Sequence, residues 1–221
     1  DTLSYATSQD KILVAAAGND GWATLMYPAA DTNVLAVAAT DWNDQRASYS
    51  NYGSWIDVAA PGGEVEAPGG KSMIYTTQHS VISIGDYAYT TGTSLSTPHI
   101  SGMAGLILSR YQGLTKLQTD YIIKNSVDTI TTDQPIGTGR INLDKAMINW
   151  YCSDSTTLKQ CSTTQPLFCD FDASFNLSLI DNCQQCGCSQ GYSCDPSGSC
   201  LAIVSPSLGS SPMAIKIESV T

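Results

Sequence analysis

Three short apolar runs, residues 11–17, 33–39 and 55–60, dominate the first third of the chain. The first run ends at Gly-Asn-Asp-Gly (18–21) and the third ends at Pro-Gly-Gly (61–63). Continuous apolar runs bounded by turn residues are typical of strands buried on both faces of a parallel sheet. Ligands of open α/β sheets bind beyond the carboxyl ends of the strands, so the turn at 18–21 is a candidate site.

Helical patterns follow these strands. Residues 100–108 are apolar nearly all round, which predicts a helix buried in the core, with Gly102 and Gly105 allowing close approach of neighbouring elements. A one-sided apolar pattern predicts a second helix from about Leu114 to Ser126, and residues 143–150 form a third candidate. Strands followed by helices predict an α/β domain over residues 1–150.

Composition limits the classes of function. The 221 residues are 42% hydrophobic and 14% charged, which indicates a globular chain. The formal net charge of −10 argues against nucleic-acid binding and leaves no polybasic patch for a membrane surface. The sequence has no apolar run long enough to span a bilayer, so we expect no transmembrane segment.

A cluster of cysteines marks a change of character after residue 150. Eight clustered cysteines predict up to four disulfides and an oxidising compartment, either secreted, at the extracellular surface or lumenal. Roughly a hundred pairings are possible and the spacing does not choose among them. We therefore divide the chain into 1–150, a disulfide module at 151–200 and a tail at 201–221. The cysteines are Cys152, Cys161, Cys169, Cys183, Cys186, Cys188, Cys194 and Cys200.

Zinc is the rival interpretation of this cluster, because Cys183 and Cys186 have the spacing of metal ligands. Cys188 crowds a third sulfur beside them and the region has no histidine, so disulfides are favoured over a metal site. Asn176-Leu-Ser is a sequon that predicts glycosylation, in keeping with the same compartment.

The stretch Thr-Gly-Thr-Ser-Leu-Ser-Thr-Pro-His (91–99) carries the candidate chemistry. Pro98 fits the first turn of a helix, where its missing N–H is no loss. Ser94 is then expected at or just before the helix start, where free N–H groups favour developing negative charge. The alternative is an ordinary serine cap of the helix.

This stretch closely resembles the active-site serine motif of the subtilisin-like serine proteases, the subtilases. The resemblance implies that Ser94 is the nucleophile of an endopeptidase whose substrate is a polypeptide. The strand and turn at 14–21 resemble the family's segment that delivers the oxyanion-hole asparagine, which corresponds to Asn19 here. The backbone N–H of Ser94 would supply the second donor; the alternative is that Asn19 merely shapes its turn.

Other segments continue the resemblance over about residues 10–148, including 45–53, 57–62 and 139–146. It implies the C-terminal portion of a parallel-sheet subtilisin-like α/β fold, followed by the disulfide-rich module. Residues 64–89 are longer and more polar than compact members of the family require. We predict that they form a surface insertion, a hairpin beside the active site.

The resemblance also implies the walls of the pocket for the substrate side chain before the scissile bond. The matching positions are Ala16, Gly18, Asp20 and Met26. Small residues are usual at the last position, so Met26 predicts a shallower, apolar pocket. Asp20 at the rim could favour a basic residue, although we predict a preference for apolar or mid-sized side chains.

A serine nucleophile needs a histidine as base and a carboxylate to orient it. The family order is Asp, His, Ser, so both partners should precede residue 1. His79 lacks the Gly-Thr that follows the family's histidine, and His99 follows Ser94 on the same helix and should point away from it. We therefore assign neither histidine as the base.

Three explanations of the missing partners remain open. The chain is the C-terminal piece of a protease whose upstream segment or companion chain supplies them, or an incompletely covered polypeptide, or a pseudoprotease that serves as a binding or structural module. A half-sheet with exposed edges should not fold alone, which favours the first. Retention of both Ser94 and Asn19 favours an active enzyme.

The C-terminal region adds no catalytic motif. Residues 183–200 loosely resemble a growth-factor-like disulfide module, which is either a stapled appendage or a docking element. Residues 214–217 predict a strand added to another element. The chemistry requires no cofactor and no metal motif is evident; the resemblance allows a structural calcium ion, for which no ligands can be assigned.

Overall fold

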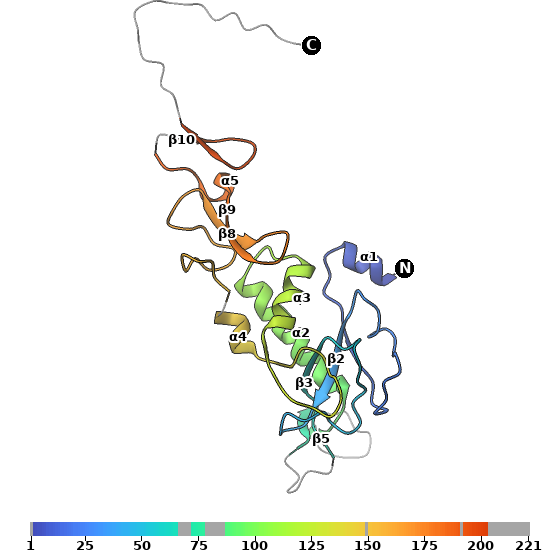
Figure 1. The fold of residues 1–221 in the computed structure, drawn as a ribbon. Helices are drawn as coiled ribbons and strands as arrows, with labels where there is room; N and C mark the ends of the chain where they lie inside the picture. Colours follow the sequence, from blue (N-terminus) through green and yellow to red (C-terminus); the bar gives the residue numbers. More distant parts are fainter. Residues whose placement is uncertain (1, 66–71, 78–86, 149, 191, 203–221) are drawn as a thin grey trace, which may run out of the picture.

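A computed structural model describes residues 2–65, 72–77, 87–148, 150–190 and 192–202 (Figure 1). Its main sheet has the order β1-β2-β3-β7-β6, in which all neighbours are parallel except β6 and β7. The strands are β1 (Val14–Ala16), β2 (Leu35–Thr40), β3 (Val58–Pro61), β7 (Arg140–Ile141) and β6 (Val127–Asp128). The predicted α/β fold with a parallel sheet is confirmed.

The burial of the strands follows their place in the sheet. β2 is central and buried at all six residues, and β3 is buried at Val58, Ala59 and Ala60. β1 is only half-buried, and shorter than the predicted run at 11–17. The prediction that this first run is buried on both faces is wrong, because β1 is the edge strand of the sheet among the described residues.

Helix α2 (Thr93–Arg110) packs across β1, β2 and β3 (Figure 1). Its buried face consists of Ile100, Met103, Ala104 and Ile107, at the spacing of one helical stripe. The opposite face is exposed and includes Gly102 and Gly105, where an added Cβ would meet no atom within 4 Å. The prediction of a helix buried all round is therefore wrong for the described residues.

Two further helices complete the layer around α2. α3 (Lys116–Asn125) begins with a capping box in which the Thr115 hydroxyl accepts from the Gln118 N–H and the Gln118 side chain accepts in return. α4 (Leu143–Ile148) follows β7, as the sequence predicts for the last helix of the domain. A short helix, α1 (Thr2–Ser8), precedes β1 and has no buried residue.

The predicted insertion contains an antiparallel pair, β4 (Ile74–Thr77) with β5 (Tyr87–Thr90). Its outer face carries Tyr75, whose ring lies 5.4 Å from that of Tyr87 and 4.8 Å from that of Tyr89. β5 leads into α2 within three residues, which confirms a hairpin beside the serine motif.

The cysteine-rich segment, orange to red in Figure 1, packs against α3 through aromatic side chains. The Phe171 ring lies 5.7 Å from both the Tyr121 ring of α3 and the Trp150 ring. Phe171 and the fully buried Leu158 belong to the same core as α2 and α3. The segment contains β8 (Leu167–Phe171), β9 (Leu177–Asp181), α5 (Cys183–Cys186), β10 (Tyr192–Cys194) and β11 (Cys200–Ala202).

Two sequence predictions lie outside the described residues. These are the strand at 214–217 and the environment of His79. Among the helices that the structure describes, none has both the length and the apolar character needed to cross a membrane.

Candidate active site

Ser94 is the second residue of α2 and is exposed to solvent. The helix is preceded by Gly92, whose φ of 152° and burial against the loop after β1 favour glycine. Because the N-cap residue is Gly92 and Ser94 lies inside the helix, Ser94 is not the serine cap of the alternative interpretation. At this position the Ser94 N–H has no intrahelical acceptor and remains a free donor.

Pro98 lies six residues into α2 rather than in its first turn, which corrects the sequence prediction. The helix begins earlier because Thr93 is bonded directly to Asn19. Pro98 has no N–H for the Ser94 carbonyl, four residues before it.

Asn19 lies in the turn after β1, next to the start of α2. Its Oδ1 accepts hydrogen bonds from the Thr93 N–H (2.9 Å) and the Thr93 hydroxyl (2.8 Å). With the oxygen used in this way, the amide Nδ2 keeps its two donors, and it makes no hydrogen bond within the part of the chain that the structure describes. A Cβ placed on Gly92 would lie 3.6 Å from Nδ2 and 3.8 Å from the Ser94 nitrogen. Asn19 Oδ1 lies 3.9 Å from the same position, so the end of the Asn19 side chain and the Ser94 nitrogen flank Gly92 together.

Thr93 is a site residue that sequence reasoning missed. It is fully buried, and its hydroxyl donates to Asn19 Oδ1 while accepting from the Gly18 N–H at 3.2 Å. The hydroxyl thus fixes which side-chain atom of Asn19 faces inward. The available signal was a threonine directly before the candidate nucleophile.

Tyr49 supports the other side of the helix start. Its hydroxyl oxygen lies 2.8 Å from the carbonyl oxygens of Gly62 and Gly63, and the Gly92 N–H donates to Gly62 at 3.0 Å. Burial raises the pKa of Tyr49 well above its usual value, so the hydroxyl stays protonated as a donor. The segment preceding Ser94 is therefore held from β3 as well as from β1.

The four predicted pocket residues lie on β1 and the loop that follows it. A Cβ on Gly18 would be 3.4 Å from Met26 Cγ, so these two positions are neighbours. Ala16 is half-buried in β1, and Asp20 is exposed. The loop is apolar beyond Asp20, with exposed Trp22, Leu25, Met26 and Tyr27.

Comparison with known proteins identifies the family to which this chain belongs. Residues 1–145 match the Subtilase family. The chain belongs to the subtilase family. It is 40% identical over 146 residues to thermitase of Thermoactinomyces vulgaris, covering 66% of this chain and 47% of thermitase. It is 38% identical over 143 residues to the thermophilic serine proteinase of Bacillus sp. strain AK1, covering 64% of this chain and 32% of that protein.

Solved structures agree with this assignment of the subtilase fold. A protease of Pseudoalteromonas arctica superposes with a TM-score of 0.59 at 33% identity, covering 66% of this chain and 44% of that one. The subtilase chain described here spans about half or less of the length of these relatives. The matched part includes the serine motif and the asparagine turn.

His99 of this subtilase is not placed to serve Ser94. The His99 ring is exposed, and its Nδ1 lies 2.8 Å from the Leu95 carbonyl oxygen of the same helix. The ring thus lies along α2, one turn beyond the serine. His79 lies outside the described residues.

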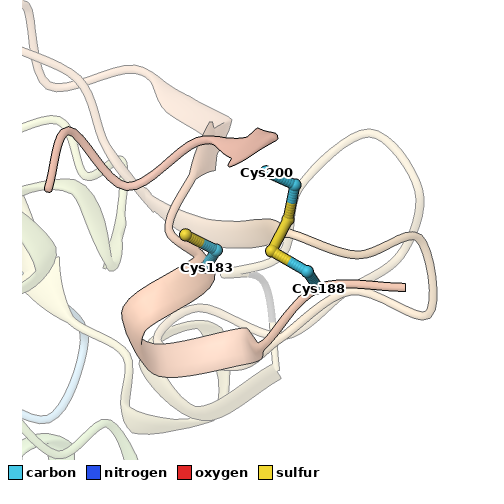
Figure 2. A group of neighbouring side chains, drawn as sticks. All are labelled: Cys183, Cys188 and Cys200. Atoms are coloured by element: carbon cyan, nitrogen blue, oxygen red, sulfur yellow. A yellow bond between two sulfur atoms is a disulfide. The ribbon is translucent and has the colours of Figure 1, made fainter. Parts of the chain in front are cut away.

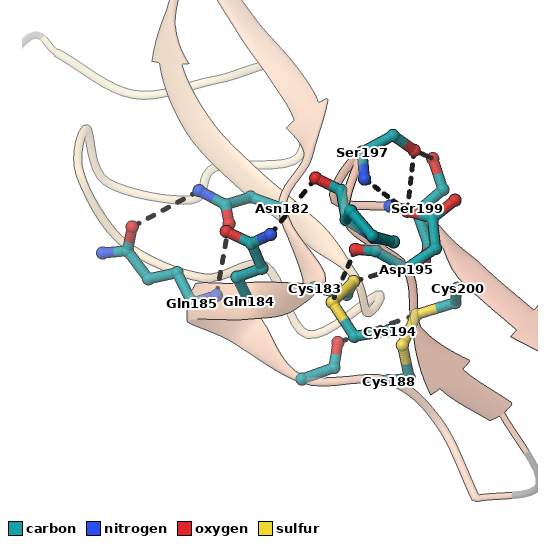
Figure 3. Close-up of a disulfide and its surroundings, with 12 residues drawn as sticks. Asn182, Cys183, Gln184, Gln185, Cys188, Cys194, Asp195, Ser197, Ser199 and Cys200 are labelled. Atoms are coloured by element: carbon teal, nitrogen blue, oxygen red, sulfur yellow. Dashed lines mark hydrogen bonds between the residues drawn. A yellow bond between two sulfur atoms is a disulfide. The ribbon is translucent and has the colours of Figure 1, made fainter. Parts of the chain in front are cut away.

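All eight cysteines form disulfides, which decides the pairing that the sequence left open. Cys183, Cys188 and Cys200 have sulfur atoms within 4.8 Å of one another, the distance expected of metal ligands (Figure 2). However, Cys183 is bonded to Cys194, and Cys188 to Cys200 (Figure 3), so their thiolates are not available to zinc. The pairs are Cys152–Cys169, Cys161–Cys186, Cys183–Cys194 and Cys188–Cys200.

The predicted glycosylation site, Asn176, is exposed in the turn between β8 and β9. Its Nδ2 donates a long hydrogen bond of 3.4 Å to Asp172. Solvent therefore reaches the amide that the sequon predicts to be modified.

Proposed function

We propose that the complete protein is a serine endopeptidase in which Ser94 is the nucleophile. The observation that carries this proposal is the orientation of Asn19. Its oxygen is bonded to Thr93, and its amide nitrogen and the Ser94 nitrogen both lie within 4 Å of the position that a Cβ on Gly92 would take. Two donors that converge beside a serine at a helix start suit a tetrahedral oxyanion.

In the proposed reaction, Ser94 Oγ attacks the carbonyl carbon of the scissile peptide bond while a histidine takes the hydroxyl proton. The carbonyl oxygen becomes negative and accepts hydrogen bonds from Asn19 Nδ2 and the Ser94 N–H. The histidine then gives its proton to the leaving amine, and an acyl-enzyme forms on Ser94. Water releases the acid by the same steps, and no cofactor takes part.

The histidine and aspartate of the triad are proposed to come from an upstream segment or a companion chain. Two features of the described residues support this. The first is the outer edge of β1, which pairs with no other described strand. The second is the exposed face of α2 around Gly102 and Gly105, on the helix that packs against β1. A packed layer over this face would complete the parallel sheet and bury the helix.

The proposed substrate is a polypeptide with an apolar or mid-sized residue before the scissile bond. Met26 reaches toward Gly18 and narrows the space between the two pocket walls. The exposed apolar side chains of the same loop favour an apolar substrate segment.

We also propose that the protein works outside the reducing cytosol. The four disulfides and the exposed sequon asparagine support a secreted, surface or lumenal location. A structural calcium ion stays an expectation from the family alone, with no ligand set proposed.

The test is hydrolysis of internally quenched peptides by the complete protein and by its Ser94→Ala variant. We expect turnover that is abolished by the substitution while circular dichroism and the unfolding temperature are unchanged. Equal turnover by both proteins would assign the cleavage to a contaminant. Tight peptide binding without turnover by the wild-type protein would favour the pseudoprotease alternative.

A further inference from the structure

Asn51 makes three side-chain hydrogen bonds to the loop that carries Asn19. Its Nδ2 donates to the Ala17 carbonyl at 2.9 Å, and its Oδ1 accepts from the N–H groups of Asp20 (3.1 Å) and Trp22 (3.0 Å). Only 1% of the residue is exposed. The bonds reach backbone groups on both sides of Asn19, which itself is free of them.

The backbone around Asn51 strengthens this attachment. The Asn51 N–H donates to the Gly18 carbonyl at 3.0 Å, and the Gly21 N–H donates to the Tyr49 carbonyl at 2.7 Å. A Cβ on Gly18 would lie 2.4 Å from Asn51 Nδ2, so the loop backbone rests directly on this amide. Any side chain at position 18 would therefore collide with this amide.

Asparagine suits this position because its amide offers donors and an acceptor at fixed geometry. Alanine would leave the buried Ala17 carbonyl and the part-buried N–H groups of Asp20 and Trp22 without these partners. Aspartate keeps the oxygen that accepts from Asp20 and Trp22, and replaces only the donor to Ala17. Asn51 touches neither Ser94 nor the point where the two oxyanion donors converge, so it takes no direct part in the reaction.

We propose that Asn51 is a positioning residue, which holds the turn after β1 so that the Asn19 amide faces the developing oxyanion. This inference rests on the proposed function. The turn is then fixed from two sides, by Asn51 on its inner backbone and by Thr93 on the Asn19 oxygen. A displacement of about 1 Å at such a donor lowers turnover by about 100-fold.

The first test is a double-mutant cycle in the complete protein with Asn19→Ala and Asn51→Ala. Asn19→Ala should lower kcat by about 100- to 1,000-fold, the loss known from removing the equivalent kind of donor from a subtilisin. Asn51→Ala should lower kcat by about 10- to 100-fold and change KM by less than about twofold. In the Asn19→Ala background, Asn51→Ala should lower kcat by no more than about twofold, because the amide that Asn51 positions is already absent.

Two further variants separate positioning from loss of stability. If Asn51→Ala fails to fold, Asn51→Asp replaces it, because aspartate preserves the volume of the side chain. Its effect on kcat should likewise disappear in the Asn19→Ala background. Asn142→Ala is the matched control, because the Asn142 Oδ1 also accepts from a part-buried backbone N–H, that of Lys145, at a site far along the chain from the loop. It should lower the unfolding temperature without changing kcat per folded molecule.

Amide hydrogen exchange tests the same inference without turnover. In Asn51→Ala the N–H groups of Asp20 and Trp22 should exchange at least about tenfold faster than in wild type, whereas the Ala39 N–H, bonded to Ser50, should not change.

The outcomes for Asn51 and for the proposed function are distinct. If the wild-type protein is active but Asn51→Ala lowers kcat as much in the Asn19→Ala background as in wild type, Asn51 does not act through Asn19. That result would overturn the positioning role and leave the proposed protease function intact. Unchanged exchange at Asp20 and Trp22 would overturn it whatever the activity. A wild-type protein without turnover would instead contradict the proposed function.

Discussion

The two polar atoms of the Asn19 side chain have different tasks. The oxygen accepts from the backbone and hydroxyl of Thr93, and the amide is thereby left free beside Ser94. The same threonine hydroxyl accepts from the Gly18 N–H, so its own position is fixed, and rotation of the asparagine would break both bonds from Thr93. The N–H and the hydroxyl of Thr93 together select the oxygen of Asn19, and in the proposed reaction this leaves the amide for the substrate.

Met26 gives the residue-scale prediction about specificity. Met26→Gly removes the side chain that approaches Gly18, so kcat/KM should rise by about 10-fold or more for peptides with a large aromatic residue before the scissile bond. Peptides with alanine there should change by less than about twofold. Peptide series in the complete protein measure this, with Asp20→Asn as a control that alters only basic substrates. An equal change for every peptide would contradict the proposed pocket.

The sequence predicts candidate site residues that lie in short local motifs, but not the contacts between residues far apart along the chain. Ser94 and Asn19 were predicted because short, specific stretches surround each of them. The bonds of Asn51 and Thr93 join positions about thirty and seventy-five residues apart, and only the fold brings them together.

Among the elements, the junction of β6, β7 and α4 is organised by one carboxylate. Asp128 accepts from Asn142 at 2.9 and 3.0 Å and from Arg140 at 2.7 Å, and Lys145 lies 3.0 Å away. Hydrogen bonds from Asn142, then Arg140 and Lys145, lower the pKa of Asp128 to about 2. The charged form is therefore favoured in the folded state.

This shift predicts a pH dependence of stability. Because the folded pKa lies below the unfolded value of 3.8, the contribution of Asp128 is fully present above about pH 4 and is lost as the pH falls through about 2. Asp128→Asn should lower the free energy of unfolding by about 1 kcal/mol at pH 7. Urea unfolding should show this difference constant from pH 5 to 7 and shrinking toward pH 2. A difference independent of pH would contradict the assignment.

The open face of α2 gives a second prediction at this scale. In the complete protein, Gly102→Leu should lower the unfolding temperature, by an amount equivalent to about 1–3 kcal/mol, because the proposed covering layer approaches there. Gly102→Ala, which adds one methyl group, should cost less. If the face is instead exposed in the complete protein, both changes should stabilise the helix by about 1 kcal/mol, and calorimetry distinguishes the two results.

The local sequence pattern predicts some features of the helices and strands but not others. The apolar runs predicted β1, β2 and β3 because buried parallel strands are continuous in hydrophobicity. Pro98 suggested a later helix start, but the tertiary bonds of Thr93 begin α2 earlier. The glycines of α2 predict close contacts with neighbouring elements, whereas the described residues leave both positions open.

Of the two hydrophobic clusters in the described part of the chain, the one beneath α2 and α3 extends into the cysteine-rich segment. Phe171→Ala should therefore destabilise the entire chain, by about 3–5 kcal/mol, since its ring contacts Tyr121, Trp150 and Phe175. Unfolding should remain a single transition when followed by tryptophan fluorescence and by circular dichroism. Tyr192→Ala, at an exposed position, should change stability little. Two separate transitions in the Phe171→Ala variant, with the first unaffected, would contradict a shared core.

Cysteine content alone predicted the disulfides that the structure contains, but not their partners. The pairing depends on how β8, β9 and α5 are folded against each other, which spacing along the chain does not encode. The same limit applies to the attachment of the segment, because the aromatic contacts of Phe171 with Tyr121 are long-range.

Covalent labelling of the nucleophile tests the central claim most directly. The complete protein is incubated with a fluorophosphonate probe, digested and analysed by mass spectrometry. We predict one modified peptide with the phosphonyl group on Ser94, no labelling of Ser94→Ala, and much slower labelling of Asn19→Ala. A folded wild-type protein that remains unlabelled, or is labelled at another serine, would contradict the account.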